Sequence, residues 1–227
     1  MASLKDIRRR IGSVKNTQQI TKAMKMVSAA KLRRAQELIT GARPFADKVE
    51  ALTSRILAEL LSQETNSENK KPLHPLLRQN PTVEPGEKPR CTVVAISSDK
   101  GLCGAYNTNV IKLAIKHITA LQADYDVKVY CVGRKVGDAL RKRKIAVEQM
   151  TDFWAAPLTQ TRVNKITRPL VDEFIFGNTD RLEFVYTEFK SAISFEARTR
   201  TILPLAVATD EGAMLGKSYL FKPSREE

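Results

Sequence analysis

The first sixty residues follow one long helical pattern. From Leu4 to Leu61 the only residues that disfavour a helix are Gly12, Gly41 and Pro44. At about 1.5 Å per residue such a helix would be roughly 85 Å long. A globular domain within a chain of 227 residues does not need a helix of that length. We therefore expect it either to reach a distant partner or to pack against a helix outside this chain, and we expect Pro44 to kink it or open one turn.

Apolar residues follow one stripe of this pattern. Leu4, Ile7, Ile11 and Val14 are spaced by three, four and three positions, as in a coiled coil. We call these four residues the apolar seam. The stripe becomes polar over residues 17–22 and then resumes with a shifted phase, which changes the local supercoil. The seam predicts that a second helix packs along this one.

The same helix carries most of the positive charge of the chain. Residues 1–50 hold 12 Lys/Arg against 4 Asp/Glu, a surplus of 8 out of a net +13. A merely solvated helix face usually interleaves both signs, so this bias predicts an acidic partner. Nucleic acid is one alternative, although the first 34 residues contain no aromatic side chain for base stacking. Ten cations face the single acid Asp6 there: Lys5, Arg8, Arg9, Arg10, Lys15, Lys22, Lys25, Lys31, Arg33 and Arg34.

The rest of the chain divides into three segments. Residues 62–90 contain five prolines and almost no periodicity, which predicts a linker or flexible excursion. Residues 91–209 alternate strand and helix patterns and predict an α/β, Rossmann-like domain with a largely parallel sheet. Residues 210–227 form a C-terminal segment. The expected strands are 91–97, 127–132, 145–149, 182–189 and 199–208, and the expected helices are 107–121, 134–144 and 159–176.

No pattern in the chain indicates a catalytic, cofactor or metal site. Asp99, Gly101 and Gly104 lie in the turn that follows the first strand, where α/β proteins often bind phosphate. That turn lacks the glycine spacing of a nucleotide site, so we interpret it as a tight turn that uses glycine flexibility. Residues 212–218 have three residues between their glycines, whereas a phosphate-binding loop needs four. Cys103 would need a nearby histidine to act as a nucleophile, and we expect it to be at least half buried.

The cysteine content and the hydropathy limit the cellular setting. Cys91, Cys103 and Cys131 fit neither a zinc spacing nor a disulfide framework, so we interpret them as reduced thiols in a cytosolic-facing protein. The chain has no run of 18 apolar residues, which excludes a typical transmembrane helix. The N-terminus also has no apolar signal region.

Two motifs resemble those of a known family. Residues 7–36, IRRRIGSVKNTQQITKAMKMVSAAKLRRAQ, resemble the N-terminal helix of the gamma subunit of F-type ATP synthase, of the bacterial type. Residues 98–107, SDKGLCGAYN, resemble the turn after the first strand in that family, and residues 203–205 also match its pattern. The resemblance extends over essentially the whole chain.

The resemblance implies a non-catalytic rotor shaft of the central stalk, which couples proton-driven rotation to conformational change in the catalytic subunits. It implies alpha and beta subunits in a hexamer, an epsilon subunit and a ring of c subunits as partners. It implies no cofactor, no nucleic acid and no direct membrane insertion. The location would be peripheral, on the cytoplasmic face of the bacterial inner membrane. By the family pattern, Lys22, Met24 and Lys25 would face the beta subunit.

The C-terminal residues lead to one further expectation. Ser224 and Glu227 have the S-x-x-E spacing of a helix start and follow Pro223. In the family, a second shaft helix pairs with the first, so we expect residues 210–227 to lead into a helix that is missing here. The segment also lacks room for the cysteine-bearing insertion of plant-type relatives, so we expect no thiol regulation.

Overall fold

A computed structural model provides the structure, and the chain divides into two compact units. One is built on the long N-terminal helix, and the other contains residues 64–207. The C-terminal segment considered above lies outside the described residues. The structure describes residues 3–64, 74–78, 81–84, 86–150, 153–191 and 194–205.

The described part of the N-terminal unit is one helix, α1 (Leu4–Glu64), of 61 residues and therefore roughly 90 Å long. Its start is fixed by a reciprocal cap. The backbone N–H of Lys5 donates to Ser3 Oγ, and the backbone N–H of Ser3 donates to Asp6 Oδ2. This cap satisfies backbone groups that the first turn leaves unpaired.

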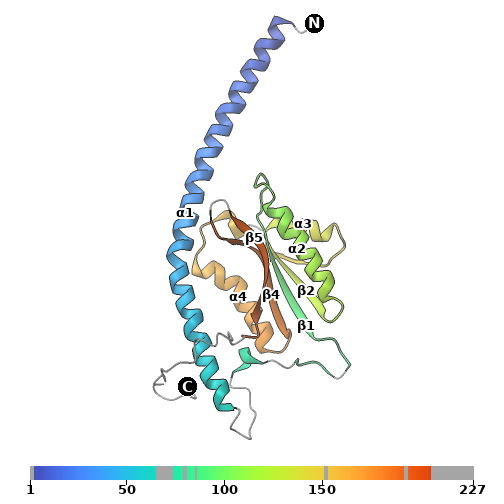
Figure 1. Cartoon of the computed structure of the whole chain (residues 1–227). Helices are drawn as coiled ribbons and strands as arrows, with labels where there is room; N and C mark the ends of the chain where they lie inside the picture. Colours follow the sequence, from blue (N-terminus) through green and yellow to red (C-terminus); the bar gives the residue numbers. More distant parts are fainter. Residues whose placement is uncertain are drawn as a thin grey trace. The chain divides into compact units, whose positions relative to one another are not determined.

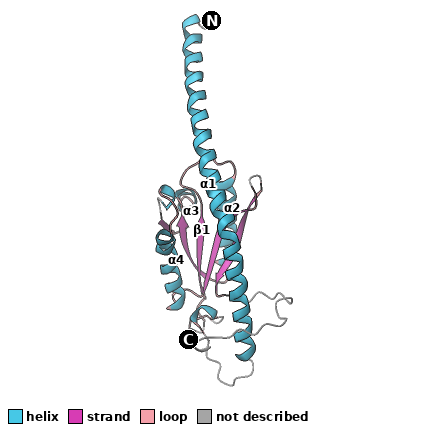
Figure 2. Cartoon of the chain, turned by 90° about the vertical axis from the view of Figure 1, so that its left-hand side faces the viewer, coloured by secondary structure: helices cyan, strands magenta, loops and turns pink. Residues whose placement is uncertain are grey.

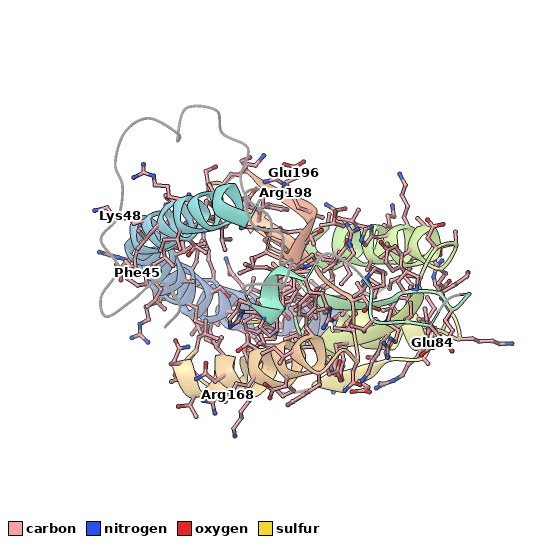
Figure 3. All side chains as sticks on the ribbon, turned by 90° about the horizontal axis from the view of Figure 1, so that it is seen from below. Phe45, Lys48, Glu84, Arg168, Glu196 and Arg198 are labelled. Carbon is pink, nitrogen blue, oxygen red and sulfur yellow. The ribbon has the colours of Figure 1, made fainter. Side chains whose placement is uncertain are left out.

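Pro44 lies inside α1 without ending it. The helix is continuous from Leu4 to Glu64, and Figure 1 shows gradual curvature in place of the expected kink or opened turn. A proline removes one hydrogen bond, but the neighbouring turns can hold the helix together when its flanking residues favour helix. Phe45 and Lys48 project outward from this stretch (Figure 3), and Phe45 is 75% exposed.

The second unit contains a five-stranded sheet in the order β3-β2-β1-β4-β5. The first four strands in this order are parallel, and β5 is antiparallel to β4, so the sheet is largely parallel as predicted. The strands lie side by side in Figure 2. Their bounds are β1 (Arg90–Ile96), β2 (Asp126–Val132), β3 (Glu148–Met150), β4 (Arg181–Phe189) and β5 (Phe195–Leu203).

Helices cover both faces of this sheet. Helices α2 (Tyr106–Leu121) and α3 (Arg134–Arg141) pack on one face, and α4 (Gln160–Ile175) packs on the other (Figure 1). Each face has its own apolar core, because successive strand residues point to opposite sides. Two short 3₁₀ helices complete the described elements, η1 (Pro75–Leu77) and η2 (Phe153–Ala155).

Four elements have boundaries that differ from the prediction by more than one residue. Helix α1 continues to Glu64, three residues beyond its predicted end at Leu61. Helix α3 ends at Arg141 and not at residue 144, because the backbone reverses there. The third strand covers Glu148–Met150, later than predicted. Strand β5 begins at Phe195, since its hairpin register with β4 extends to the Phe189–Phe195 pair. It ends before Pro204, which lacks an N–H for the ladder; residues 206–208 of that prediction lie outside the described residues.

Gly133 permits close contact at the junction between β2 and α3. Its φ is 98°, and a Cβ atom there would lie 2.2 Å from the carbonyl oxygen of Ser97. Only glycine fits such a conformation and approach. The approach lets Ser97 Oγ accept from the backbone N–H of Val136 at 3.0 Å, while Asp99 Oδ1 accepts from that of Arg134 at 2.8 Å.

The described part of the proline-rich segment is attached to the α/β unit. Asp180, which is 5% exposed, accepts from the backbone N–H of Thr82 at 2.8 Å and from that of Arg90 at 2.8 Å. Arg78 donates to the carbonyl oxygens of Phe174 and Thr179. Burial alone would raise the pKa of Asp180, but the hydrogen bonds from Thr82 and Arg90 and the charge of Arg90 hold that pKa below its ordinary value.

Candidate functional site

The apolar seam of α1 is open to solvent. Leu4 is 68%, Ile7 47%, Ile11 51% and Val14 66% exposed. A solvent-facing apolar stripe of this kind is what a second helix would bury in a coiled coil. The seam is therefore the first candidate interaction surface.

The stripe continues past Val14 as a shallow, open face of α1. Lys22 and Lys25 lie on this face, in line with Val14. Met24 is not among the residues that line it, although its side chain is also exposed, at 52%. The residues lining this face are Ser13, Val14, Thr17, Gln18, Thr21, Lys22 and Lys25.

Two of the polar residues that interrupt the stripe form their hydrogen bonds within α1 itself. Thr17 Oγ1 donates to the carbonyl oxygen of Ser13 at 3.0 Å, and Thr21 Oγ1 donates to that of Thr17 at 2.7 Å. Each hydroxyl is therefore engaged within its own helix. A partner that packs here can contact the methyl groups without having to satisfy these hydroxyl groups.

The cations of the first half of α1 form few ionic contacts. Among the described residues, the only salt bridge found there joins Arg33 to Glu37, at 3.0 Å and largely exposed. Lys22 and Lys25 have no acidic partner within that part of the chain. Their charge is available to an acidic partner surface.

The turn after β1 is held together by hydrogen bonds within itself. Gly104 has a φ of 57° and uses glycine freedom as expected, whereas the other positive φ, 60°, belongs to Leu102 and not to Gly101. Asp99 caps α3, as described above. Ser98 Oγ donates to the carbonyl oxygen of Lys100 at 2.6 Å. These polar groups form hydrogen bonds within the turn or to α3. Within the described residues we find no set of free hydrogen-bond donors that converge on a phosphate site.

Asn107 organises this turn, a role that the sequence analysis missed. Its Oδ1 accepts from the backbone N–H of Ser98 at 3.1 Å and lies 3.0 Å from Ser98 Oγ, whose proton is directed to Lys100. Its Nδ2 donates to the carbonyl oxygen of Lys100 at 3.2 Å and to Cys103 Sγ at 3.0 Å. Asn107 is only 9% exposed. A polar residue at an inward-facing position of the apolar pattern at the helix start is the one sequence signal that could have indicated this role.

We expect Asn107→Leu to destabilise the α/β unit by about 1–3 kcal/mol, because it leaves the polar groups of the turn without partners. Thermal unfolding measures the loss, and hydrogen exchange of the amides of residues 98–105 locates it. Asn109→Leu is the matched control, because Asn109 is exposed on the same helix. Equal effects of the two changes would show that the hydrogen bonds of Asn107 contribute nothing.

The cysteines and histidines give no nucleophilic pair. Cys103 is exposed, contrary to our expectation, because the whole turn over residues 101–105 is exposed. His117 is hydrogen-bonded to Glu183, and His74 Nδ1 accepts from the backbone N–H of Leu76. Cys91 and Cys131 are buried, and burial raises the pKa of both to about 12.

Two further searches cover only the described residues. No group of three or more His, Cys, Asp or Glu side chains there is placed to hold a metal ion. Within the same residues, no helix combines the length and the apolar character needed to cross a bilayer.

The chain has relatives over its whole length. A family model described as ATP synthase matches residues 3–227. The ATP synthase gamma chain of Flavobacterium psychrophilum is 40% identical over 227 residues, covering 100% of this chain and 74% of that protein. That of Maricaulis maris is 40% identical over 233 residues, covering 100% of this chain and 75% of that protein.

Solved structures also match. The rotor of the Euglena gracilis mitochondrial ATP synthase aligns with a TM-score of 0.45 and 16% identity, covering 86% of this chain and 61% of that chain. The central stalk and c-ring of the Tetrahymena thermophila mitochondrial enzyme align with a TM-score of 0.43 and 20% identity, covering 69% of this chain and 71% of that chain.

Proposed function

This chain belongs to the ATP synthase gamma-chain family, and we propose that its long helix serves as the rotating shaft of the central stalk. The chain is a non-catalytic central-stalk subunit of an F-type ATP synthase, in which catalysis takes place on other subunits. Rotation of α1 inside a ring of subunits would change the conformation of each of those subunits in turn.

One observation carries this proposal. Helix α1 extends over 61 residues and keeps both its apolar seam and its cations exposed. A helix of this length transmits motion over a distance that a compact domain cannot cover. Its seam provides for a second helix, and a pair of helices is stiffer than one. Its stripe of small, polar and basic groups favours weak, screened contacts that can be broken and re-formed.

The partners follow from the same proposal. Alpha and beta subunits would surround the shaft, with acidic surfaces facing its cations. An epsilon subunit and the c-ring would contact the α/β unit. The chain would then lie at the periphery of the membrane, on the cytoplasmic face of a bacterial inner membrane. We propose no cofactor for the chain itself.

Reconstitution tests the proposal. The purified chain alone should neither bind nor hydrolyse ATP, and mixing it with alpha and beta subunits should give a stable complex whose ATP turnover depends on its presence. ATP turnover by the isolated chain, or its failure to join the complex, would refute the proposed function.

The excess of basic residues also supports a second candidate, a nucleic-acid-binding protein with a basic arm. This candidate predicts duplex DNA binding that weakens steeply as salt increases. A titration between low and physiological salt decides the matter, since the absence of binding at low salt removes the candidate.

A further inference from the structure

Four consecutive cations begin at the last residue of α3 and continue past it. Residues 141–144, Arg-Lys-Arg-Lys, are all exposed, and we call them the basic turn. Arg141 lies 3.9 Å from Asp138. Lys142, Arg143 and Lys144 have no acidic partner among the described residues. The turn therefore presents concentrated charge that the α/β unit itself does not neutralise.

The backbone of the basic turn reverses in a conformation that usually requires glycine. The N–H of Lys144 donates to the carbonyl oxygen of Arg141 at 2.9 Å, and that of Ile145 donates to the carbonyl oxygen of Leu140 at 3.1 Å. This pair of bonds is the Schellman ending of a helix, whose left-handed residue is usually glycine. Here that residue is Lys144, with a φ of 61°. A lysine therefore occupies a backbone position at which glycine would be less strained.

Helix capping alone does not account for these residues. Cations near a helix C-terminus interact favourably with its dipole, but this effect is confined to the last turn and is weak at exposed sites. Four adjacent cations also repel one another. A strained backbone position that carries a charged side chain in place of glycine points to a use for that side chain outside the domain.

We propose that the basic turn docks a carboxylate-rich surface of a neighbouring protein subunit. The inference rests on the proposed function, because the neighbour would be another subunit of the ATP synthase. Arg141 and Arg143 supply planar guanidinium groups, which match carboxylates in a bidentate geometry. Lys142 and Lys144 add point charges that steer the approach of the partner.

A protein partner fits better than a membrane surface. The apolar side chains of α3, Val136 and Leu140, are buried against the sheet. The basic turn adds no large exposed apolar residue that could insert among lipid chains. Binding to anionic lipid is therefore the competing outcome of the test.

Carbodiimide cross-linking of the purified ATP synthase complex provides that test, because it joins lysine amines directly to carboxylates in contact. We expect mass spectrometry to find Lys142 or Lys144 linked to an acidic residue of another subunit. Arg141→Glu with Arg143→Glu retains both amines and should reduce these links at least tenfold. Arg141→Lys with Arg143→Lys keeps the charge but loses the bidentate geometry, so it should give fewer links than the parent chain and more than the glutamate variant. Lys112→Glu with Lys116→Glu, which changes the same net charge on the exposed side of α2, should leave them unchanged.

A second variant separates docking from folding. Lys144→Gly should raise the thermal midpoint of the isolated chain, because it relieves the left-handed backbone, and should reduce the links formed by Lys142. A lower midpoint would contradict the strain on which the inference rests.

Three outcomes would overturn the proposal. An intact complex without links from Lys142 or Lys144 to another subunit refutes the docking surface but leaves the proposed function standing. The second outcome again lacks these links, but the parent chain binds anionic vesicles and the Arg141→Glu, Arg143→Glu variant does not. That outcome assigns the basic turn to the membrane surface. Absence of the chain from the complex would refute the proposed function first and the inference with it.

Discussion

Replacing Ile7 and Ile11 together with alanine should abolish stable assembly with the other subunits while leaving the isolated chain folded. In the isolated chain these side chains are 47% and 51% exposed, so their removal costs little there. Alanine also favours helix more than isoleucine does. If a partner helix buries the apolar seam, each change costs about 2–5 kcal/mol in the complex. The two together therefore cost about 4 kcal/mol or more, enough to reduce the complex roughly a thousandfold.

Two measurements check this expectation. Circular dichroism of the isolated variant should show unchanged or greater helicity, and gel filtration with the partner subunits should show loss of the complex. Ile7→Leu with Ile11→Leu is the matched control, because it conserves volume and should retain assembly. An alanine variant that assembles with the yield of the parent chain would show that the seam is not buried in the complex.

The parts of the structure that the sequence predicts are those determined by local pattern. The helix of the first sixty residues, the buried strand at residues 91–97 and the helix at residues 159–176 follow from periodicity and from caps such as Thr159. The α/β class follows from the alternation of these patterns. Coiled-coil pairing along the apolar seam stays a prediction, because it concerns a surface with no partner chain.

The missed features depend on groups that meet only in space. The role of Asn107 requires the geometry of the turn, and the exposure of Cys103 follows from the exposure of that whole turn. The end of α3 depends on Lys144 taking a left-handed conformation that its residue type does not favour.

Glu183 is another contact that no local pattern reveals. It is 2% exposed on β4, and its carboxylate accepts from His117 of α2 and from Arg181. Thr201 of β5 donates to the same carboxylate at 3.3 Å. The cluster joins α2 to β4 and to the edge strand β5. Charges buried in this way are stable only while every partner is present.

The environment of Glu183 determines its ionisation. Burial alone would raise the pKa of this carboxyl group, but the hydrogen bond from His117 and the charge of Arg181 outweigh burial and lower the pKa. The negative charge of Glu183 in turn contributes to the raised pKa of Cys91, for which burial is the larger cause. Glu183 is therefore ionised in the folded chain at neutral pH.

We expect Glu183→Ala to destabilise the α/β unit by about 3–5 kcal/mol, because it leaves Arg181 without its counter-charge and His117 without its hydrogen-bond partner. The pH dependence should also change. The folded pKa of Glu183 lies below the unfolded value of about 4.3, so its carboxylate stabilises the fold fully above that pH. The contribution is lost as the pH falls through the folded pKa. Glu183→Gln should therefore remove this part of the acid sensitivity while retaining the shape of the side chain.

Denaturant unfolding at pH 7, 5 and 3 tests both expectations. Stability of the parent chain should fall more steeply between pH 5 and pH 3 than that of Glu183→Gln, and the two should differ most at neutral pH. Glu188→Gln is the control on the same strand, because its ion pair with Arg198 is partly exposed, solvent screens it, and it should contribute little. If Glu183→Gln matches the parent chain at every pH, the cluster does not hold α2 against the edge of the sheet.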